Sequence, residues 1–199
     1  MRVTAQSVLC AATACILSSS IQAAVTLYEG PGTFGDWWSA ASSPTTVDFT
    51  EFPQGTWITD QYSDLGITFT SSDPDIVLFD PSSFLLDGVG INGLSQVQMA
   101  FASPTFAFGY HHPGIHGIQL WSGSTLLYAS PALGQSGMFD FSGVISTTPF
   151  DRVVLVPTIP NGAVVLDNMY FSSVPAPGAI SLLAIGSCAL GARRRRVGA

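Results

Sequence analysis

Hydrophobic and polar residues alternate through most of the chain between residues 45 and 171. Neighbouring side chains of a β-strand point to opposite faces, so this period of two predicts strands with one buried and one exposed face. The alternating segments are residues 45–49, 66–70, 96–101, 105–110 and 138–141. Two strongly apolar segments, residues 152–156 and 163–171, predict two further strands.

Turn signals stand between these segments as Pro-Gly, Ser-Gly and Asn-Gly pairs. No segment shows a convincing helical period, and residues 57–65 are expected to form a helical turn at most. Many short strands at close spacing are typical of antiparallel sandwiches and jelly rolls. We therefore predict an all-β domain, an antiparallel β-sandwich or jelly roll, over residues 25–173.

The first 24 residues follow a different pattern. Arg2 precedes an apolar run over residues 8–17, and Ala23 and Ala24 end a stretch of small and polar residues. This order is typical of a secretory signal peptide, and the apolar run is too short to span a membrane. Residues 1–24 are therefore predicted to form a signal helix that directs export.

The segment 174–199 combines a proline motif, a short apolar run and an arginine cluster. The motif consists of Val174, Pro175, Ala176 and Pro177. Proline removes a ladder donor, so the sheet is expected to end here, and residues 178–192 predict a short membrane helix of about 22 Å. Basic residues after such a helix stay cytoplasmic. The cluster consists of Arg193, Arg194, Arg195 and Arg196.

This tail resembles the PEP-CTERM sorting signal, in a variant that has VPAPGA in place of Pro-Glu-Pro. The resemblance implies recognition by an exosortase-type sorting protease in a Gram-negative envelope. It also implies an exported precursor tethered to the inner membrane by the C-terminal helix, and final delivery to the cell surface or the extracellular matrix. The signal specifies an address and not an activity.

Charge is distributed unevenly along the chain. All 13 acidic residues lie between Glu29 and Asp167, where Arg152 is the only basic residue, so this part carries a net charge of −12 with neutral histidines. Such a surface repels phosphate backbones, which excludes nucleic acid as a partner. The cysteines lie in the terminal segments, so residues 25–173 can form neither a disulfide nor a thiolate metal site. They are Cys10, Cys15 and Cys188.

Tryptophans supply the candidate ligand-binding residues, because a flat indole offers an apolar surface to the C–H groups of a sugar ring. The four tryptophans are Trp37, Trp38, Trp57 and Trp121. If Ile118 faces inward, strand alternation places Gln119 and Trp121 together on the outer face. Trp121, Gln119 and Trp57 are the candidates for glycan binding, and burial in the core is the alternative for each tryptophan.

Three carboxylates, Asp48, Glu51 and Asp167, are the candidate calcium ligands. They could share a calcium ion if the first and last strands lie side by side, since calcium prefers hard oxygen ligands. The alternative is that they face solvent or, for Asp167, hold a turn.

Three histidines, His111, His112 and His116, surround a Pro-Gly pair. They could bind a transition metal, or form the polar tip of a hairpin. No Gly-x-Ser-x-Gly elbow, zinc-protease motif or phosphate-binding glycine loop occurs in the chain. We therefore predict that the protein is not an enzyme, and structural calcium is its candidate cofactor.

Several short motifs resemble a β-sandwich module that is common in PEP-CTERM proteins. They are VDF at residues 47–49, LGITF at 65–69, FAFG at 106–109, GIQLW at 117–121 and LDNMYF at 166–171. The module is similar to carbohydrate-binding jelly rolls, some of which hold a structural calcium, and Asp167 matches the late acidic ligand.

The function expected from these features is that of a surface-sorted, non-enzymatic β-sandwich protein of the cell envelope or biofilm matrix that binds extracellular polysaccharide. One alternative is a purely structural protein that associates with itself. A weaker alternative is a jelly-roll enzyme that acts on matrix glycans.

Overall fold

The computed structural model describes residues 23–71, 76–79, 89–93, 95–134, 140–159 and 162–175. The predicted signal peptide, apart from Ala23 and Ala24, and the predicted sorting tail beyond Pro175 lie outside these residues. Within the described ranges, no helix is long and apolar enough to cross a membrane.

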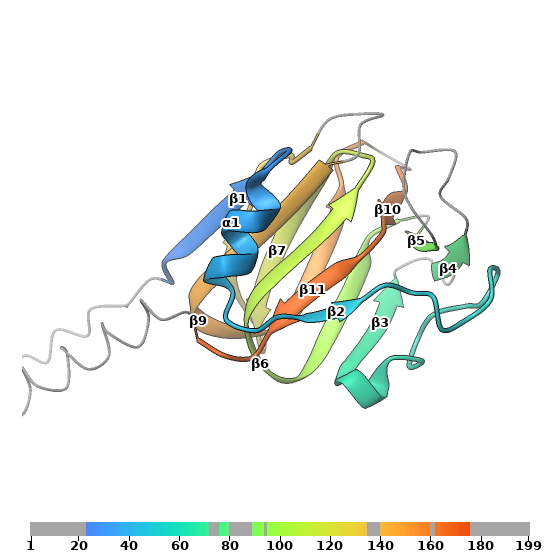
Figure 1. Cartoon of the computed structure of the whole chain (residues 1–199), viewed down its shortest axis with the longest axis horizontal. Coiled ribbons are helices and arrows are strands. Elements are labelled where there is room, and N and C mark those ends of the chain that lie inside the picture. Colours follow the sequence, from blue (N-terminus) through green and yellow to red (C-terminus); the bar gives the residue numbers. More distant parts are fainter. Residues whose placement is uncertain are drawn as a thin grey trace, which may run out of the picture.

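The described chain folds mainly into antiparallel β-sheets, which confirms the all-β prediction (Figure 1). The main sheet has eight strands: β1 (Val25–Glu29), β2 (Thr45–Val47), β3 (Ile67–Ser71), β6 (Val97–His112), β7 (His116–Ser122), β8 (Thr125–Ala129), β9 (Asp140–Pro157) and β11 (Met169–Ser172). A small sheet has three: β4 (Ile76–Phe79), β5 (Gly90–Gly93) and β10 (Val164–Leu166). The helices are α1 (Thr33–Ala40) and the 3₁₀ turn η1 (Ser63–Leu65).

Two long strands, β6 and β9, pair along their length and divide the main sheet into two halves. Their register shifts between Ala100 and Ala107, where both strands carry extra residues. On one side of this irregularity they pair with β1 and β11, and β11 pairs in turn with β2; we call this the helix-covered half. On the other side they pair with β3 and β7, and β7 pairs in turn with β8; we call this the open half.

The predicted strands lie in these elements, but several boundaries were wrong. Segments 96–101 and 105–110 are one strand, β6, because a bulge lets a strand bend without ending. Segment 163–171 is two strands, β10 and β11, which belong to different sheets. The break lies at Asp167 and Asn168, where the backbone pairs with His111 instead. The N–H of Asp167 donates to the carbonyl oxygen of His111 over 2.9 Å, and the carbonyl oxygen of Asn168 accepts from the N–H of His111 over 3.0 Å.

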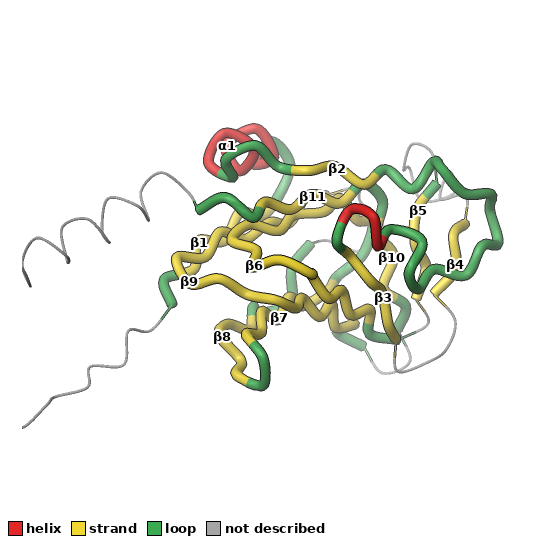
Figure 2. The backbone as a smooth tube through the Cα atoms, turned by 90° about the horizontal axis from the view of Figure 1, so that it is seen from below, coloured by secondary structure: helices red, strands yellow, loops and turns green. Residues whose placement is uncertain are grey.

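The main core lies between the inner face of the main sheet and the small sheet, which sits beside one end of it (Figure 2). The inner face contributes side chains such as Phe108, Leu120 and Leu155, all fully buried. The small sheet adds Ile91 and Leu166, which are also fully buried. The alternation of side chains along a strand explains this burial, because on β7 Ile118 and Leu120 are buried while Gln119 and Trp121 are partly exposed.

Helix α1, which the sequence did not predict, covers the outer face of the helix-covered half (Figure 1). Its Trp37 is fully buried and lies over Gly109 and Gly143, which face each other across β6 and β9. A Cβ atom at Gly143 would come within 2.6 Å of the indole. Trp37 is therefore a packing residue and not the sugar platform considered from the sequence, because no ligand can reach it. The helical turn predicted within residues 57–65 is confirmed as η1.

Candidate functional site

On the outer face of the open half, most side chains of the described strands remain accessible. Thr68 and Thr70 on β3 are exposed, and the residues that face outward on β6, β9 and β7 are partly exposed, with the exception of buried Val154. Helix α1 packs instead against β9 and β1 of the other half. A ligand could therefore approach this surface, which we call the open face.

The pairing register of five strands places the side chains of the open face in two rows. The first row is Thr68, Ala100, Arg152, Trp121 and Leu126. The second row is Thr70, Gln98, Val154, Gln119 and Ala129. Residues directly opposite each other on neighbouring strands share a face, so these rows form one continuous surface. It combines two amides, two hydroxyls, one indole and one guanidinium with four aliphatic side chains, Ala100, Leu126, Val154 and Ala129.

Trp121 and Gln119 lie on the same face of β7, as strand alternation predicts. The indole Nε1 of Trp121 donates a hydrogen bond to Oε1 of Gln119 over 3.2 Å. The guanidinium carbon of Arg152 lies 4.7 Å from the centre of the Trp121 ring, within the range of a cation–π interaction. The indole is thus oriented from two sides by residues of the same surface.

Arg152 also helps to hold the turn between β7 and β8. Its Nη2 donates to the carbonyl oxygen of Gly123 over 3.2 Å, while the backbone N–H of Gly123 donates to Oδ2 of Asp151 over 2.8 Å. Gly123 has a φ of 57°, a left-handed conformation that glycine adopts without steric cost. Sequence reasoning did not single out Arg152 as a site residue. The sequence could have pointed to it, because Arg152 is the only basic residue of the predicted domain.

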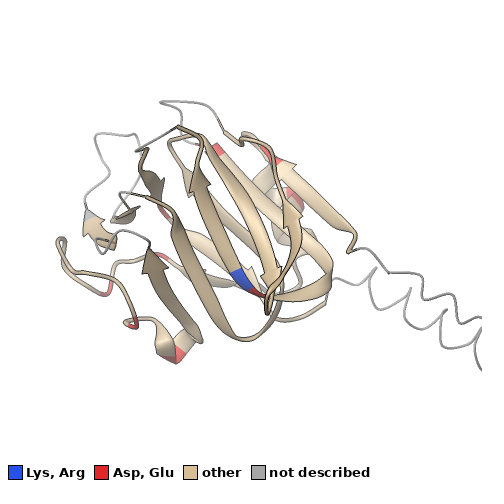
Figure 3. Cartoon of the chain, turned by 180° about the vertical axis from the view of Figure 1, so that it is seen from behind, with Lys and Arg blue, Asp and Glu red and all other residues tan. Residues whose placement is uncertain are grey.

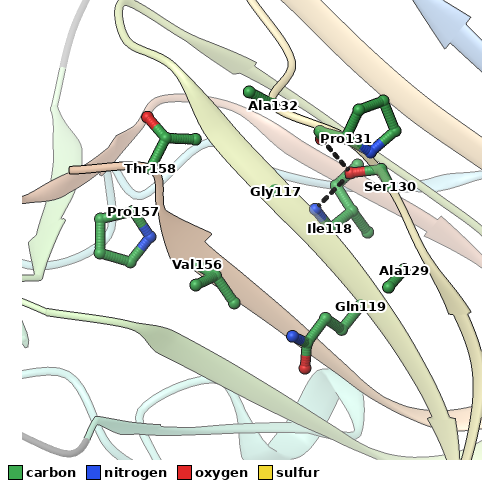
Figure 4. Close-up of a pocket in the computed structure, with 10 residues that line it drawn as sticks. All are labelled: Gly117, Ile118, Gln119, Ala129, Ser130, Pro131, Ala132, Val156, Pro157 and Thr158. Atoms are coloured by element: carbon green, nitrogen blue, oxygen red, sulfur yellow. Dashed lines mark hydrogen bonds between the residues drawn. The ribbon is translucent and has the colours of Figure 1, made fainter.

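A shallow pocket of about 200 Å³ borders the open face at the far end of β7 (Figure 4). Gln119 and Val156 line it on the sheet side, and Ser130 and Thr158 contribute hydroxyl groups. The Ser130 hydroxyl is already engaged, since it accepts from Ile118 N at 2.8 Å and donates to Pro131 O at 2.7 Å. Because Gln119 belongs to both, the pocket and the open face form one continuous surface.

Trp57 does not belong to this surface. It is 62% exposed, but it forms an isolated bridge with Val77 of β4, which belongs to the small sheet. Trp38 is 40% exposed on α1 and packs edge-on against Tyr170. Of the candidate ligand-binding residues, the structure therefore brings together Trp121 and Gln119 and separates Trp57 from them.

The three predicted calcium ligands do not form a metal site. Asp48 is exposed and accepts hydrogen bonds from the backbone and hydroxyl of Thr50, and Glu51 accepts one from the Tyr62 hydroxyl. Asp167 is buried, with 1% of its surface exposed. Among the described residues, no group of three histidine, cysteine or acidic side chains could hold a metal ion. The structure therefore does not bring Asp48, Glu51 and Asp167 together as one group of ligands.

The histidines do not form a polar hairpin tip, as the sequence suggested, because the segment folds inward. His112 and His116 are buried, and their rings lie 5.2 Å apart. The pKa of His116 is lowered to about 4, mainly by burial and in addition by the nearby His112. Burial also lowers the pKa of His112, and it lowers that of His111 to about 4. All three rings are therefore neutral at pH 7.

One contact in this cluster has the form of a catalytic pair, and sequence reasoning missed it. Nε2 of His112 lies 2.9 Å from the hydroxyl oxygen of Ser142, and Nδ1 of His112 lies 2.7 Å from the carbonyl oxygen of Gly114. Both side chains are completely buried, so no substrate can reach the serine hydroxyl. The pair acts here as a hydrogen bond that satisfies two buried polar groups.

No protein-family model matches the chain, and a comparison with curated proteins finds no significant relative.

Proposed function

We propose that the protein is an exported, non-enzymatic β-sandwich of the jelly-roll type that binds polysaccharide on its open face. The observation that carries this proposal is the pair of residue rows, which combine Trp121 with amide and hydroxyl side chains on one accessible surface. Gln98 already donates to the hydroxyl of Thr70 over 3.0 Å, so these groups are positioned before a ligand arrives.

The chemistry of this surface suits a glycan. Sugars present hydroxyl groups that pair with amides and hydroxyls, and C–H groups that pack on an indole. A broad sheet face accepts the interior of a chain, because it has no wall that would require a chain end. Neither row of the open face contains a carboxylate, a histidine or a cysteine, so the proposal for this surface is binding.

We further propose that the C-terminal segment sorts the protein to the cell surface or the extracellular matrix, through an exosortase-type protease. The support comes from the sequence, in the order of proline motif, apolar run and arginine cluster over residues 174–199. A polysaccharide-binding domain with such an address would act in the matrix of a biofilm.

The first test of this function is the substitution Trp121→Ala, measured by co-sedimentation of the purified protein with exopolysaccharide from the source cells. We expect wild-type binding to saturate and the variant to bind about tenfold more weakly or worse, since a large side chain at the centre of a binding surface contributes more than about 1.4 kcal/mol.

Trp57→Ala is the matched control, because it removes an exposed tryptophan from outside the open face, and its affinity is expected to equal that of the wild type. No saturable binding by the folded wild type would overturn the proposal. It would favour the alternative of a structural protein that associates with itself through an edge strand. Among the described strands, β8 pairs only with β7, and its Leu126 is 46% exposed.

The sorting proposal predicts that replacing all four arginines of residues 193–196 with glutamine releases the precursor from the membrane fraction, because the positive charges that stop transfer are lost. Replacing the same residues with lysine keeps the charge and should keep the precursor in the membrane. Fractionation of cells followed by immunoblotting measures both. Unchanged retention of the glutamine variant would contradict the sorting role of the tail.

A further inference from the structure

We propose that the polysaccharide recognised by the open face is acidic, and that Arg152 binds its carboxylate groups. This inference rests on the proposed function, because it assigns a ligand class to the same surface. It starts from the charge of the face, which is opposite in sign to that of the rest of the domain.

The positive charge of the open face comes from Arg152 alone. It is the only basic residue between Glu29 and Asp167, a stretch that holds all 13 acidic residues. Neither row of the open face contains an acidic residue. In Figure 3 the basic residue lies within the sheet, whereas most of the described acidic residues lie in loops or at strand ends.

No described carboxylate forms an ion pair with this guanidinium. The nearest in sequence is Asp151, which accepts a hydrogen bond from the backbone of Gly123 and forms no ion pair with Arg152. The guanidinium instead stacks on the Trp121 ring at 4.7 Å. An arginine that is held by stacking and by one backbone carbonyl keeps its full charge available to a ligand.

The donors that remain free on Arg152 fit a carboxylate. Nε is buried without a partner, and one Nη2 proton binds the Gly123 carbonyl. Nη1 makes no protein hydrogen bond and, unlike Nε, is not buried. Nη1 and the second proton of Nη2 are therefore the donors that remain for a ligand, and a planar carboxylate can pair with two N–H groups of a guanidinium in bidentate fashion.

The acidic surface elsewhere does not prevent this binding. Charges separated by more than about 10 Å are largely screened at 0.1 M salt, so a carboxylate at the guanidinium experiences mainly its immediate surroundings. There Asp151 is the acidic residue next to Arg152, and its carboxylate is held by the N–H of Gly123. A sugar ring that carries the carboxylate can also contact Trp121, Gln119 and Gln98 on the same face. The charge of Arg152 would then select an acidic polysaccharide, while the neighbouring side chains contact the sugar ring.

The test compares two probes with the same sugar backbone, polygalacturonate and its fully methyl-esterified form, in binding titrations with the purified protein at 0.1 M salt. We expect wild-type protein to bind the polyanion at least about tenfold more tightly, as a charge-assisted hydrogen bond is stronger than a neutral one. The preference should shrink at 1 M salt, where the screening length falls to about 3 Å.

Two substitutions separate charge from shape. Arg152→Gln should remove the preference and leave both polymers equally bound, whereas Arg152→Lys should retain part of it, because it keeps the charge and loses the planar fork. Equal binding of both polymers by the wild type would overturn this inference and leave the proposed function intact. Binding of neither polymer, nor of the exopolysaccharide from the source cells, would overturn both.

Discussion

The substitution Trp37→Ala is expected to lower the free energy of unfolding by about 3–5 kcal/mol, the range for removing a large buried aromatic side chain. Trp37 is fully buried between α1 and the sheet, packs against Phe141 and Tyr170, and donates from Nε1 to the carbonyl oxygen of Val144 over 3.3 Å. Its removal leaves a cavity over Gly109 and Gly143 and an unpaired acceptor. Urea denaturation of the purified protein, followed by tryptophan fluorescence, measures the change.

The neighbouring Trp38 is the matched control, since it is 40% exposed on the same helix. Trp38→Ala should cost about 1 kcal/mol, mainly through its tilted ring contact with Phe34 and its edge-on contact with Tyr170. Gly143→Ala tests the contact from the other side, because its new methyl group would overlap the indole, and overpacking of this kind costs about 1–3 kcal/mol. Equal effects of the two tryptophan substitutions would show that α1 does not pack as described.

The second large effect is a loss of stability in mild acid. His116 has a pKa of about 4 in the folded protein and 6.5 as an ordinary histidine. As the pH falls below 6.5, this histidine becomes protonated in the unfolded chain but stays neutral in the folded protein. The folded protein therefore loses stability down to about pH 4, where its histidine is protonated as well. From pH 7 to pH 5 this loss amounts to about 2 kcal/mol for His116.

The substitution His116→Phe tests this assignment, because it keeps an aromatic ring beside His112 and Tyr110 and removes the titrating group. The variant should lose about 2 kcal/mol less than the wild type between pH 7 and pH 5, in urea denaturation at each pH. His111 and His112 act in the same direction, so some acid sensitivity should remain. An unchanged pH dependence in the variant would contradict the burial of His116.

Much of the candidate surface could be predicted from local pattern. Alternation along β7 placed Gln119 and Trp121 on one outer face, because the direction of a side chain on a strand depends only on its position in the strand. The same reasoning could not find Arg152 as their neighbour. The register that puts it opposite Trp121 joins β7 to β9, which begin at residues 116 and 140.

The errors have a common origin in contacts between distant segments. Helix α1 has only eight residues, too few for a clear period, and it is stabilised by the glycine platform of β6 and β9. From the sequence the histidines were expected at a polar hairpin tip, because the contacts that bury them come from distant residues. The backbone of Leu133 pairs with His116, and the hydroxyl of Ser142 contacts His112. Likewise, the sequence suggests Asp167 as a metal ligand, because it does not show that the backbone around Asp167 pairs with His111.

By itself, the sequence determined the all-β class, the approximate strands, and the negative charge with its single arginine, since each follows from the order of residue types along the chain. Its terminal patterns also carry the proposed export and sorting. Only the tertiary structure decided which tryptophan is buried under a helix and which lies on an open face beside that arginine. Such choices depend on strand register and on packing between segments that are far apart in sequence, where burial is set by the partner that covers a residue and not by the residue's own type.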